Sequence, residues 1–404
     1  MNNMANNDYT SRYSKYGYGI DVRQTYTHLP AQWFWTWLTG KDHRDLEPRK
    51  PKETLLSPLQ LCLQILYSWS MIAIFIYLGY WSLSQEPLVM VPCLLLSWIM
   101  VTNRTRGLLH TFHYTSHGAA IANKPLAQFL AKWFMSIPIL HLSWDNYVQI
   151  HARDHHGLNT LCTDDDPDEN FVTDHGFYPG MPEWRYWATL ILAPFHPKNI
   201  WAHIWFRVRQ NFYDANIDEI FSRVCFWGLA LSAVSILEIW KEFAILYLIP
   251  LFLVTQYSSW LQHTTEHLWF AKKPDGVSPL VYYGSLTWGR FQGRPFPHGK
   301  SVFHKLVWWL SIFLIDVPIK VFSFMQDLPS HDFHHRSPLV NFWSIARERR
   351  ANEGKKSRFG PMAETWGLIE SWKVIRDHVC YWESDPFGLW EWSIQKNKSG
   401  ELVQ

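Results

Sequence analysis

Cysteines are few in this chain, and no two of them stand close enough to form a metal-binding pair. Five occur among 404 residues, and three of these lie in apolar segments. The pattern indicates neither a disulfide framework nor a thiolate metal site. The first 56 residues are polar and lack the apolar run of a cleavable signal peptide, so we expect none.

An excess of charge of one sign is also absent. The 37 Lys and Arg residues nearly balance the 35 Asp and Glu residues, so nothing in the charge suggests nucleic acid as a partner. Aromatic residues, by contrast, are abundant: they make up 17% of the chain, and 25 of them are tryptophans. Because Trp and Tyr gather where a bilayer meets water, this composition favours a membrane protein.

Long stretches without charge predict two transmembrane hairpins. Residues 57–82 carry no charged side chain and are long enough to span a bilayer. A short break at 85–87 follows, and residues 88–102 are again uncharged. We expect this second helix to continue through Arg104 and Arg106. The second predicted hairpin comprises residues 221–240 and 243–261, with Lys241 and Glu242 at its turn.

The distribution of basic residues predicts the orientation of the hairpins. Residues 102–220 contain nine Lys and Arg and the first 56 residues contain eight, whereas the two hairpin turns together contain only Lys241. Loops rich in Lys and Arg stay on the cytoplasmic side of a membrane. We therefore expect both termini and the long central segment to face the cytoplasm.

Three further segments lie outside the predicted spans and histidine clusters. Pro125–Trp144 and Leu306–Ile315 are apolar but interrupted, the second one by Asp316. We expect helices there that either lie in the membrane interface or pack inside a protein core. The acidic run Asp164–Asp168 is interpreted as a solvated loop.

Eight histidines form three tight clusters, each just outside a strongly apolar segment. In a helix, residues four apart share a face, so that two imidazoles can reach one metal ion. Three such clusters supply more nitrogen ligands than one tetrahedral ion can use, which predicts two metal ions. The clusters are His113 and His117, with His110 one turn earlier; His151, His155 and His156; and His331, His334 and His335.

Other histidine-rich proteins fit this pattern less well. The sequence contains no HExxH, so a zinc peptidase has little support. A metal transporter would place ionisable ligands in mid-membrane, whereas the predicted spans are nearly bare. Imidazole is a ligand suited to iron, copper or zinc, and a non-haem dinuclear iron centre would use all eight histidines.

The order HxxxH, HxxxHH and HxxHH, interleaved with two hydrophobic hairpins, resembles the membrane fatty acid desaturase and hydroxylase superfamily over residues 57–340. The resemblance implies an all-α integral membrane fold, with four transmembrane helices in two hairpins and a cytosolic helical cap that holds a histidine-rich di-iron site. It also implies two non-haem iron ions and O2 as co-substrate. Residues 1–56 and 341–404 would then be cytosolic segments.

A fourth element extends the resemblance at the end of the last span. Leu261-Gln262-His263-Thr264 is similar to a segment of acyl-lipid desaturases whose histidine binds metal, and we favour His263 on that ground. Glu266-His267 is similar to a pair in alkane ω-hydroxylases, but Leu268-Trp269 replaces the Tyr-Gly of that family. Both His263 and His267 therefore remain candidate ligands, with Glu266 as an outer partner.

Carboxylates commonly fix a ligating histidine by accepting a hydrogen bond from its second nitrogen, and we assign that role to Asp154 and Asp332, with His110 as a further outer residue. No fused cytochrome b5 module or iron–sulfur motif is recognisable. We therefore expect a separate electron donor of the ferredoxin, rubredoxin or cytochrome b5 type.

The sequence thus predicts a multi-pass membrane enzyme, with its active site on the cytoplasmic side, that desaturates a fatty acyl chain. A hydroxylase of alkyl or aromatic-methyl groups, or an oxidative decarboxylase, would fit the same scaffold. A membrane protein that binds metal without turnover is the alternative outside the enzymes.

Overall fold

The computed structural model describes residues 16–324 and 328–399, which form two compact units. We call 51–153 with 191–261 the hairpin unit, and the remaining described residues the sheet unit. Residues 1–15 and 400–404 of the predicted cytosolic segments lie outside the described residues. The boundary between the units falls between Arg153 and Asp154, inside the second histidine cluster.

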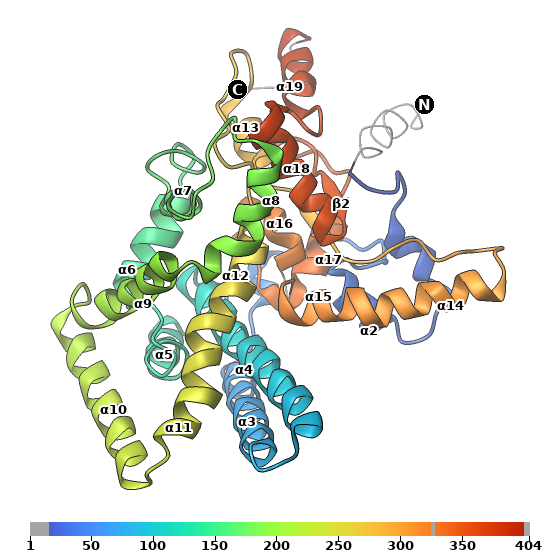
Figure 1. Ribbon diagram of the computed structural model, residues 1–404. Helices are drawn as coiled ribbons and strands as arrows, with labels where there is room; N and C mark the ends of the chain where they lie inside the picture. The colour runs from blue at the N-terminus through green and yellow to red at the C-terminus, as the bar shows by residue number, and fades with distance from the viewer. Residues whose placement is uncertain (1–15, 325–327, 400–404) are drawn as a thin grey trace. The chain divides into compact units, whose positions relative to one another are not determined.

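The hairpin unit is helical, with two pairs of long helices joined by shorter ones (Figure 1). Its elements are η2 (Pro51–Thr54), α3 (Pro58–Ser82), α4 (Pro87–Ser116), α5 (Lys124–Leu130), η3 (Ala131–Ser136), α6 (Trp144–Tyr147), the start of η4 (Val148–His155), η5 (Ala193–Phe195), α9 (Pro197–Phe212), α10 (Ile217–Ile236), α11 (Trp240–Phe243), η6 (Ala244–Leu248), η7 (Pro250–Val254) and α12 (Thr255–His263), which ends in the sheet unit.

The first predicted hairpin is present as α3 and α4. Ser57 and Gln60 begin α3 with reciprocal hydrogen bonds between side chain and backbone, and Pro58 at the first helical position fits because its missing N–H would have no partner there. As expected, α4 continues without a break past Arg104 and Arg106 into the first histidine cluster; it contains His113 and ends at Ser116, with His117 as its C-cap residue. The first cluster is therefore attached rigidly to a candidate membrane helix.

The second hairpin turns earlier than predicted. Helix α10 ends at Ile236, and the chain reverses through Glu238, whose φ of 56° is the left-handed conformation of a tight turn. The prediction of a turn at Lys241 and Glu242 was wrong, because these residues already belong to α11. From Trp240 the chain stays helical to His263, with π-helical stretches on both sides of Ile249.

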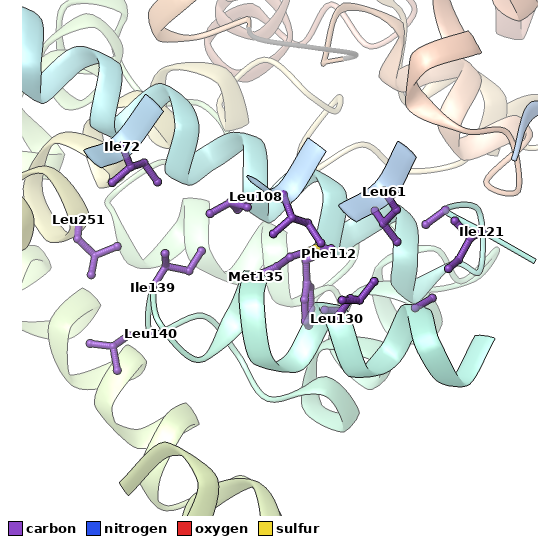
Figure 2. Packing of buried hydrophobic residues seen from close by; sticks show 14 of the residues in the cluster. Leu61, Ile72, Leu108, Phe112, Ile121, Leu130, Met135, Ile139, Leu140 and Leu251 are labelled. Carbon is purple, nitrogen blue, oxygen red and sulfur yellow. The ribbon is translucent and has the colours of Figure 1, made fainter. Parts of the chain in front are cut away.

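Among the described residues, five helices are long and apolar enough to cross a membrane, one more than predicted. Four of them are the hairpin helices, and the fifth is Val302–Phe322 of the sheet unit. The interrupted segment around Pro125 instead packs into the core of the hairpin unit. Figure 2 shows Leu130 and Met135 from this segment beside Leu61 and Phe112 of the first hairpin.

The sheet unit holds two three-residue strands among short helices. Its elements are η1 (Val22–Tyr26), α2 (Gln32–Thr39), α7 (Pro167–Asp174), α8 (Glu183–Leu192), α13 (Pro279–Ser285), β1 (Gly289–Phe291), α14 (Val302–Ser311), η8 (Ile312–Asp316), α15 (Val317–Phe322), η9 (Leu328–Ser330), α16 (His331–Arg336), α17 (Phe342–Asn352), β2 (Glu364–Trp366), α18 (Leu368–Tyr381) and α19 (Leu389–Lys398). The strands are parallel, with Arg290 opposite Thr365.

Buried ion pairs surround α16 and the two strands. Lys41 is 2% exposed, and its ammonium lies 2.8 Å from Glu364 and 3.0 Å from Glu353. The guanidinium of Arg349 donates to both oxygens of Asp332, at 2.9 and 3.0 Å. Because each buried charge has a partner, the attraction within each pair offsets the penalty of removing these charges from water. They fix the short helix that carries the third histidine cluster.

Candidate metal centre

Four histidines of the sheet unit converge in its interior. His155 ends η4, His267 follows α12, and His331 and His335 are four residues apart on one face of α16. All four are buried, and one ring nitrogen of each lies within 4.8 Å of those of the other three. As predicted from the third cluster, His331 and His335 share one helix face. The second cluster adds His155 as a candidate ligand, and the segment after the last predicted span adds His267.

The nitrogen separations fit a single metal ion. Nε2 of His331 lies 3.2 Å from Nε2 of His267 and 3.1 Å from Nε2 of His335. Two nitrogens bound to one ion at about 2.0–2.1 Å, at right or tetrahedral angles, lie roughly 2.8–3.4 Å apart. The Nε2 atoms of His267, His331 and His335 lie too close together for three unshared lone pairs, so a cation or a proton must lie between them. A metal ion would bind all three.

Burial keeps the ligands in the form that metals bind. It lowers the pKa of His267 and of His331 well below the usual value, and the neighbouring His335 lowers both further. At His155, burial also disfavours the charged ring, but the carboxylates of Asp168 and Asp166 outweigh it and raise the pKa to about 9. A metal ion would therefore meet neutral imidazoles at two positions and displace a proton at the third.

Two neighbours fix which nitrogen of a ligand carries its proton. Asp166 lies 3.0 Å from Nδ1 of His155 and accepts its N–H, so that Nε2 is the nitrogen of this ring that could bind metal. The hydroxyl of Tyr283 donates to the backbone carbonyl of His156 at 3.3 Å and lies 3.1 Å from Nδ1 of His335. Since that hydroxyl proton is used, its oxygen accepts from Nδ1 of His335, and Nε2 is the nitrogen of His335 that faces the other histidines.

Neither neighbour was predicted. Asp166 belongs to the acidic run interpreted as a solvated loop, but its residue is fully buried and its other oxygen accepts from the backbone of Cys162. The signal available in the sequence was its place eleven residues after His155, immediately before Pro167 at the start of α7. The carboxylate of Asp332, which was predicted to hold a histidine, instead pairs with Arg349. The carboxylates of Asp166 and Asp168 lie 3.0 and 3.3 Å from Nδ1 of His155.

The two remaining box histidines of the sheet unit lie beside the four. Nε2 of His334 is 3.1 Å from Nε2 of His156. The ring of His156 stacks on that of His335, with centroids 4.1 Å apart and an interplanar angle of 5°. The sheet unit therefore contains a second pair of imidazole nitrogens at metal-ligand spacing.

The hairpin unit brings together a separate group of three. The ring of His113 lies 4.3 Å from that of His151 and 5.1 Å from that of His117, centroid to centroid. Tyr147 stacks on His151 at 5.1 Å, and His110 stacks on His113 at 6.0 Å. The first cluster and the first histidine of the second thus converge within this unit, with His110 beside them as an outer residue.

The structure distinguishes the two candidate ligands after the last span. His267 is one of the four converging histidines. Both ring nitrogens of His263 instead face protein oxygens, with Glu266 2.8 Å from Nδ1 and the carbonyl of Asp168 3.2 Å from Nε2. The sequence had favoured His263, but the geometry favours His267 as the ligand, with Glu266 holding His263 beside it.

Neither a protein-family model nor a curated protein matches this chain. The histidine geometry, the burial of the ligands and the candidate membrane helices therefore carry the functional argument by themselves.

Proposed function

We propose that the protein is an O2-dependent di-iron membrane enzyme that desaturates a fatty acyl chain. The observation that carries the proposal is the group of four buried histidines, His155, His267, His331 and His335, whose ring nitrogens lie within 4.8 Å of one another. The candidate membrane helices support an apolar substrate, because they would keep the enzyme in contact with lipid.

The ligand set suits iron. All four converging side chains are imidazoles, without the thiolates that make a structural zinc site, and redox metals accept imidazole nitrogen readily. Iron bound there would supply the activation of O2 that removal of hydrogen from an unactivated C–H bond requires. Reducing equivalents would come from a separate donor of the ferredoxin, rubredoxin or cytochrome b5 type.

The protein's own residues prepare this centre in three ways. Burial of the four rings excludes water, which would compete for the ligand nitrogens. Asp166 and the hydroxyl of Tyr283 hold Nδ1 of His155 and His335, so that Nε2 of each ring keeps its lone pair. The pairing of Arg349 with Asp332 holds α16, and through it the relative positions of His331 and His335.

We assign the second iron to the hairpin unit, where the rings of His113, His117 and His151 converge. His156 and His334, whose Nε2 atoms lie 3.1 Å apart, stay candidate ligands within the sheet unit. The prediction of two ions rests on the number of box histidines, and it sets the expected iron content at two per chain.

Lipid analysis with matched variants tests the proposal. Cells that express the protein should contain acyl chains with a new double bond, detected by mass spectrometry, and the product should depend on O2. His331→Ala should abolish the product, whereas His28→Ala, which removes an exposed histidine of the same unit, should leave it unchanged. Bound iron without any O2-dependent product would identify a metal-binding protein rather than an enzyme.

A hydroxylase is the second candidate, and the inclusion of His267 in the centre favours it, because Glu266-His267 is the pair shared with ω-hydroxylases. The same lipid analysis separates the two, since a hydroxylase adds an oxygen atom and a desaturase removes two hydrogens. His263→Ala and His267→Ala form a matched pair for iron content. We expect His267→Ala to lose iron and His263→Ala to keep it. The opposite result would show that His263 is the ligand.

We further propose that both termini and the metal centre face the cytoplasm, as the distribution of Lys and Arg predicts. A reporter that is active only in the cytoplasm, fused after Gln404, should be active. Activity of an external reporter at the same position would refute this topology.

A further inference from the structure

The fifth candidate membrane helix, Val302–Phe322, buries Asp316 and Lys320 and exposes most of its apolar side chains. Every fourth residue from Trp308 is buried, and this buried row includes Asp316 and Lys320, which are 1% and 0% exposed. Asp316 accepts from Arg294 at 2.8 Å. The side of the helix that faces the protein is thus the side that carries paired charges.

The opposite face is apolar and uncovered. Phe303 is 70% exposed, Leu306 54%, Leu310 49% and Leu314 70%. These residues recur every three or four positions and so form one continuous stripe. A helix on a water-exposed surface has the reverse arrangement, and a stripe of this size is a contact site for another apolar phase.

Helix α2 extends the same apolar surface from a distant part of the sequence. It contains no charged residue, and Trp33 and Trp37, four residues apart, are 75% and 40% exposed. Its other side packs on the fifth helix, with Trp35 5.7 Å from Trp308 between ring centroids. Figure 1 shows α2 beside α14 and α15.

We propose that α2 and Val302–Phe322 form an in-plane membrane anchor of the sheet unit, whose partner is the surface of a lipid bilayer. Exposed tryptophans suit the boundary between headgroups and acyl chains. Lys300 and Lys305, at the start of the long helix, can reach anionic headgroups. The apolar stripe would then enter the acyl region, while the charged row stays against the protein.

The position of Arg294 is the reason for an in-plane helix rather than a fifth span. Arg294 pairs with Asp316 and its carbonyl accepts from Trp308, so it lies along the helix rather than at one end. Its side chain is 30% exposed. In a spanning helix this partly exposed charge would lie within the hydrocarbon, where charged side chains are costly, whereas an in-plane helix keeps it on the side that faces water.

The anchor belongs to the same unit as the four converging histidines. It would hold that unit at the membrane surface independently of the two hairpins, and it would do so whatever reaction the metal centre performs. The inference therefore stands apart from the proposed function.

Depth measurements along the helix test this anchor. Leu306, Leu310 and Leu314 are replaced singly by Cys and spin-labelled, in a protein whose Cys62, Cys93, Cys225 and Cys380 are changed to Ala; Cys162 is buried. The protein is placed in vesicles of phosphatidylcholine and phosphatidylglycerol. Collision rates with O2 and with a water-soluble nickel chelate then report the depth of each label. The three sites are about half exposed or more, so a label there should not disturb packing.

We expect the same shallow depth at all three sites, about 5–10 Å below the headgroups. Leu59, Leu66 and Ile74 of α3, labelled in the same way, provide the control and should lie at clearly different depths because α3 is a predicted span. Three results would overturn the anchor: a steady change of depth from Leu306 to Leu314, as in a span; free access of nickel to all three labels; or exclusion of both reagents, as in a protein contact.

Discussion

The two units each gather histidines, but in different surroundings. In the sheet unit, His155 is 1% exposed and His267 0%, and Asp166 and Tyr283 fix the outer nitrogens of two ligands. In the hairpin unit, His113 and His151 are each 9% exposed, and their described neighbours are aromatic rings. The first group is almost fully buried, and two of its rings contact Asp166 and Tyr283, whereas the second is slightly more exposed and its rings lie against one another and against Tyr147.

This difference indicates how each group depends on the rest of the chain. The sheet-unit histidines come from three separate segments, so their arrangement relies on buried ion pairs and on single hydrogen bonds. His113 lies in the last turn of α4 and His117 is its C-cap residue, so a single helix end positions both. We therefore expect the sheet-unit group to be sensitive to changes in outer residues, and the hairpin-unit pair to be sensitive mainly to loss of the histidines themselves.

Loss of a ligand should have the largest effect, and it tests whether the two groups hold different ions. His331→Ala should remove one iron of two and abolish activity, because a buried ligand is lost and nothing replaces it. His113→Ala should also remove one iron. Iron per chain, measured after purification, decides the point: a variant that loses both ions, or neither, would show that the groups are not separate sites.

Removal of Arg349 should be the next largest effect, and it should act on the sheet unit. Arg349→Met leaves the buried carboxylate of Asp332 without a partner, which should cost about 3–5 kcal/mol in the free energy of unfolding. Thermal unfolding monitored by circular dichroism measures the loss. The double variant Arg349→Met/Asp332→Leu should recover most of the stability; if the double variant is no better than the single one, the ion pair is not the cause.

The carboxylate of Asp166 should matter for metal affinity rather than for folding. Asp166→Asn keeps the size of the side chain but replaces the charged acceptor at Nδ1 of His155, and we expect metal affinity to fall about 10–100-fold. Titration of the metal-free protein with Fe(II) gives the affinity. Asp164→Asn, two residues away in the same acidic run, is the control and should bind iron normally. If both variants lose iron affinity equally, Asp166 acts only through its negative charge and does not position His155.

The smallest predicted effect belongs to the hydroxyl of Tyr283. Tyr283→Phe removes one hydrogen bond to His335 and keeps the ring, a change of about 0.5–1.5 kcal/mol, so iron affinity should fall only several-fold. Tyr282→Phe is the matched control, since the hydroxyl of Tyr282 donates to the carbonyl of Ala271 instead. A loss in Tyr282→Phe as large as that in Tyr283→Phe would contradict the positioning role.

The predictions that depended on local sequence patterns agree best with the structure. The uncharged runs located α3 and α4, and the expected continuation of α4 through Arg104 and Arg106 was confirmed. The length of the fifth helix was missed, because Asp316 was taken as its end. Within the fold that charge is neutralised by Arg294, so the helix continues to Phe322.

By itself, the sequence determined which residues could bind metal and which helices could meet a membrane, because both depend on residue type and on spacing within one helix. Only the tertiary structure decided that His267 rather than His263 joins His155, His331 and His335, and that Asp166 and Tyr283 hold two of these rings. These contacts join segments more than ten, and in places more than fifty, residues apart along the chain. No periodicity encodes them, since they depend on how the short helices and loops of the sheet unit pack around their buried charges.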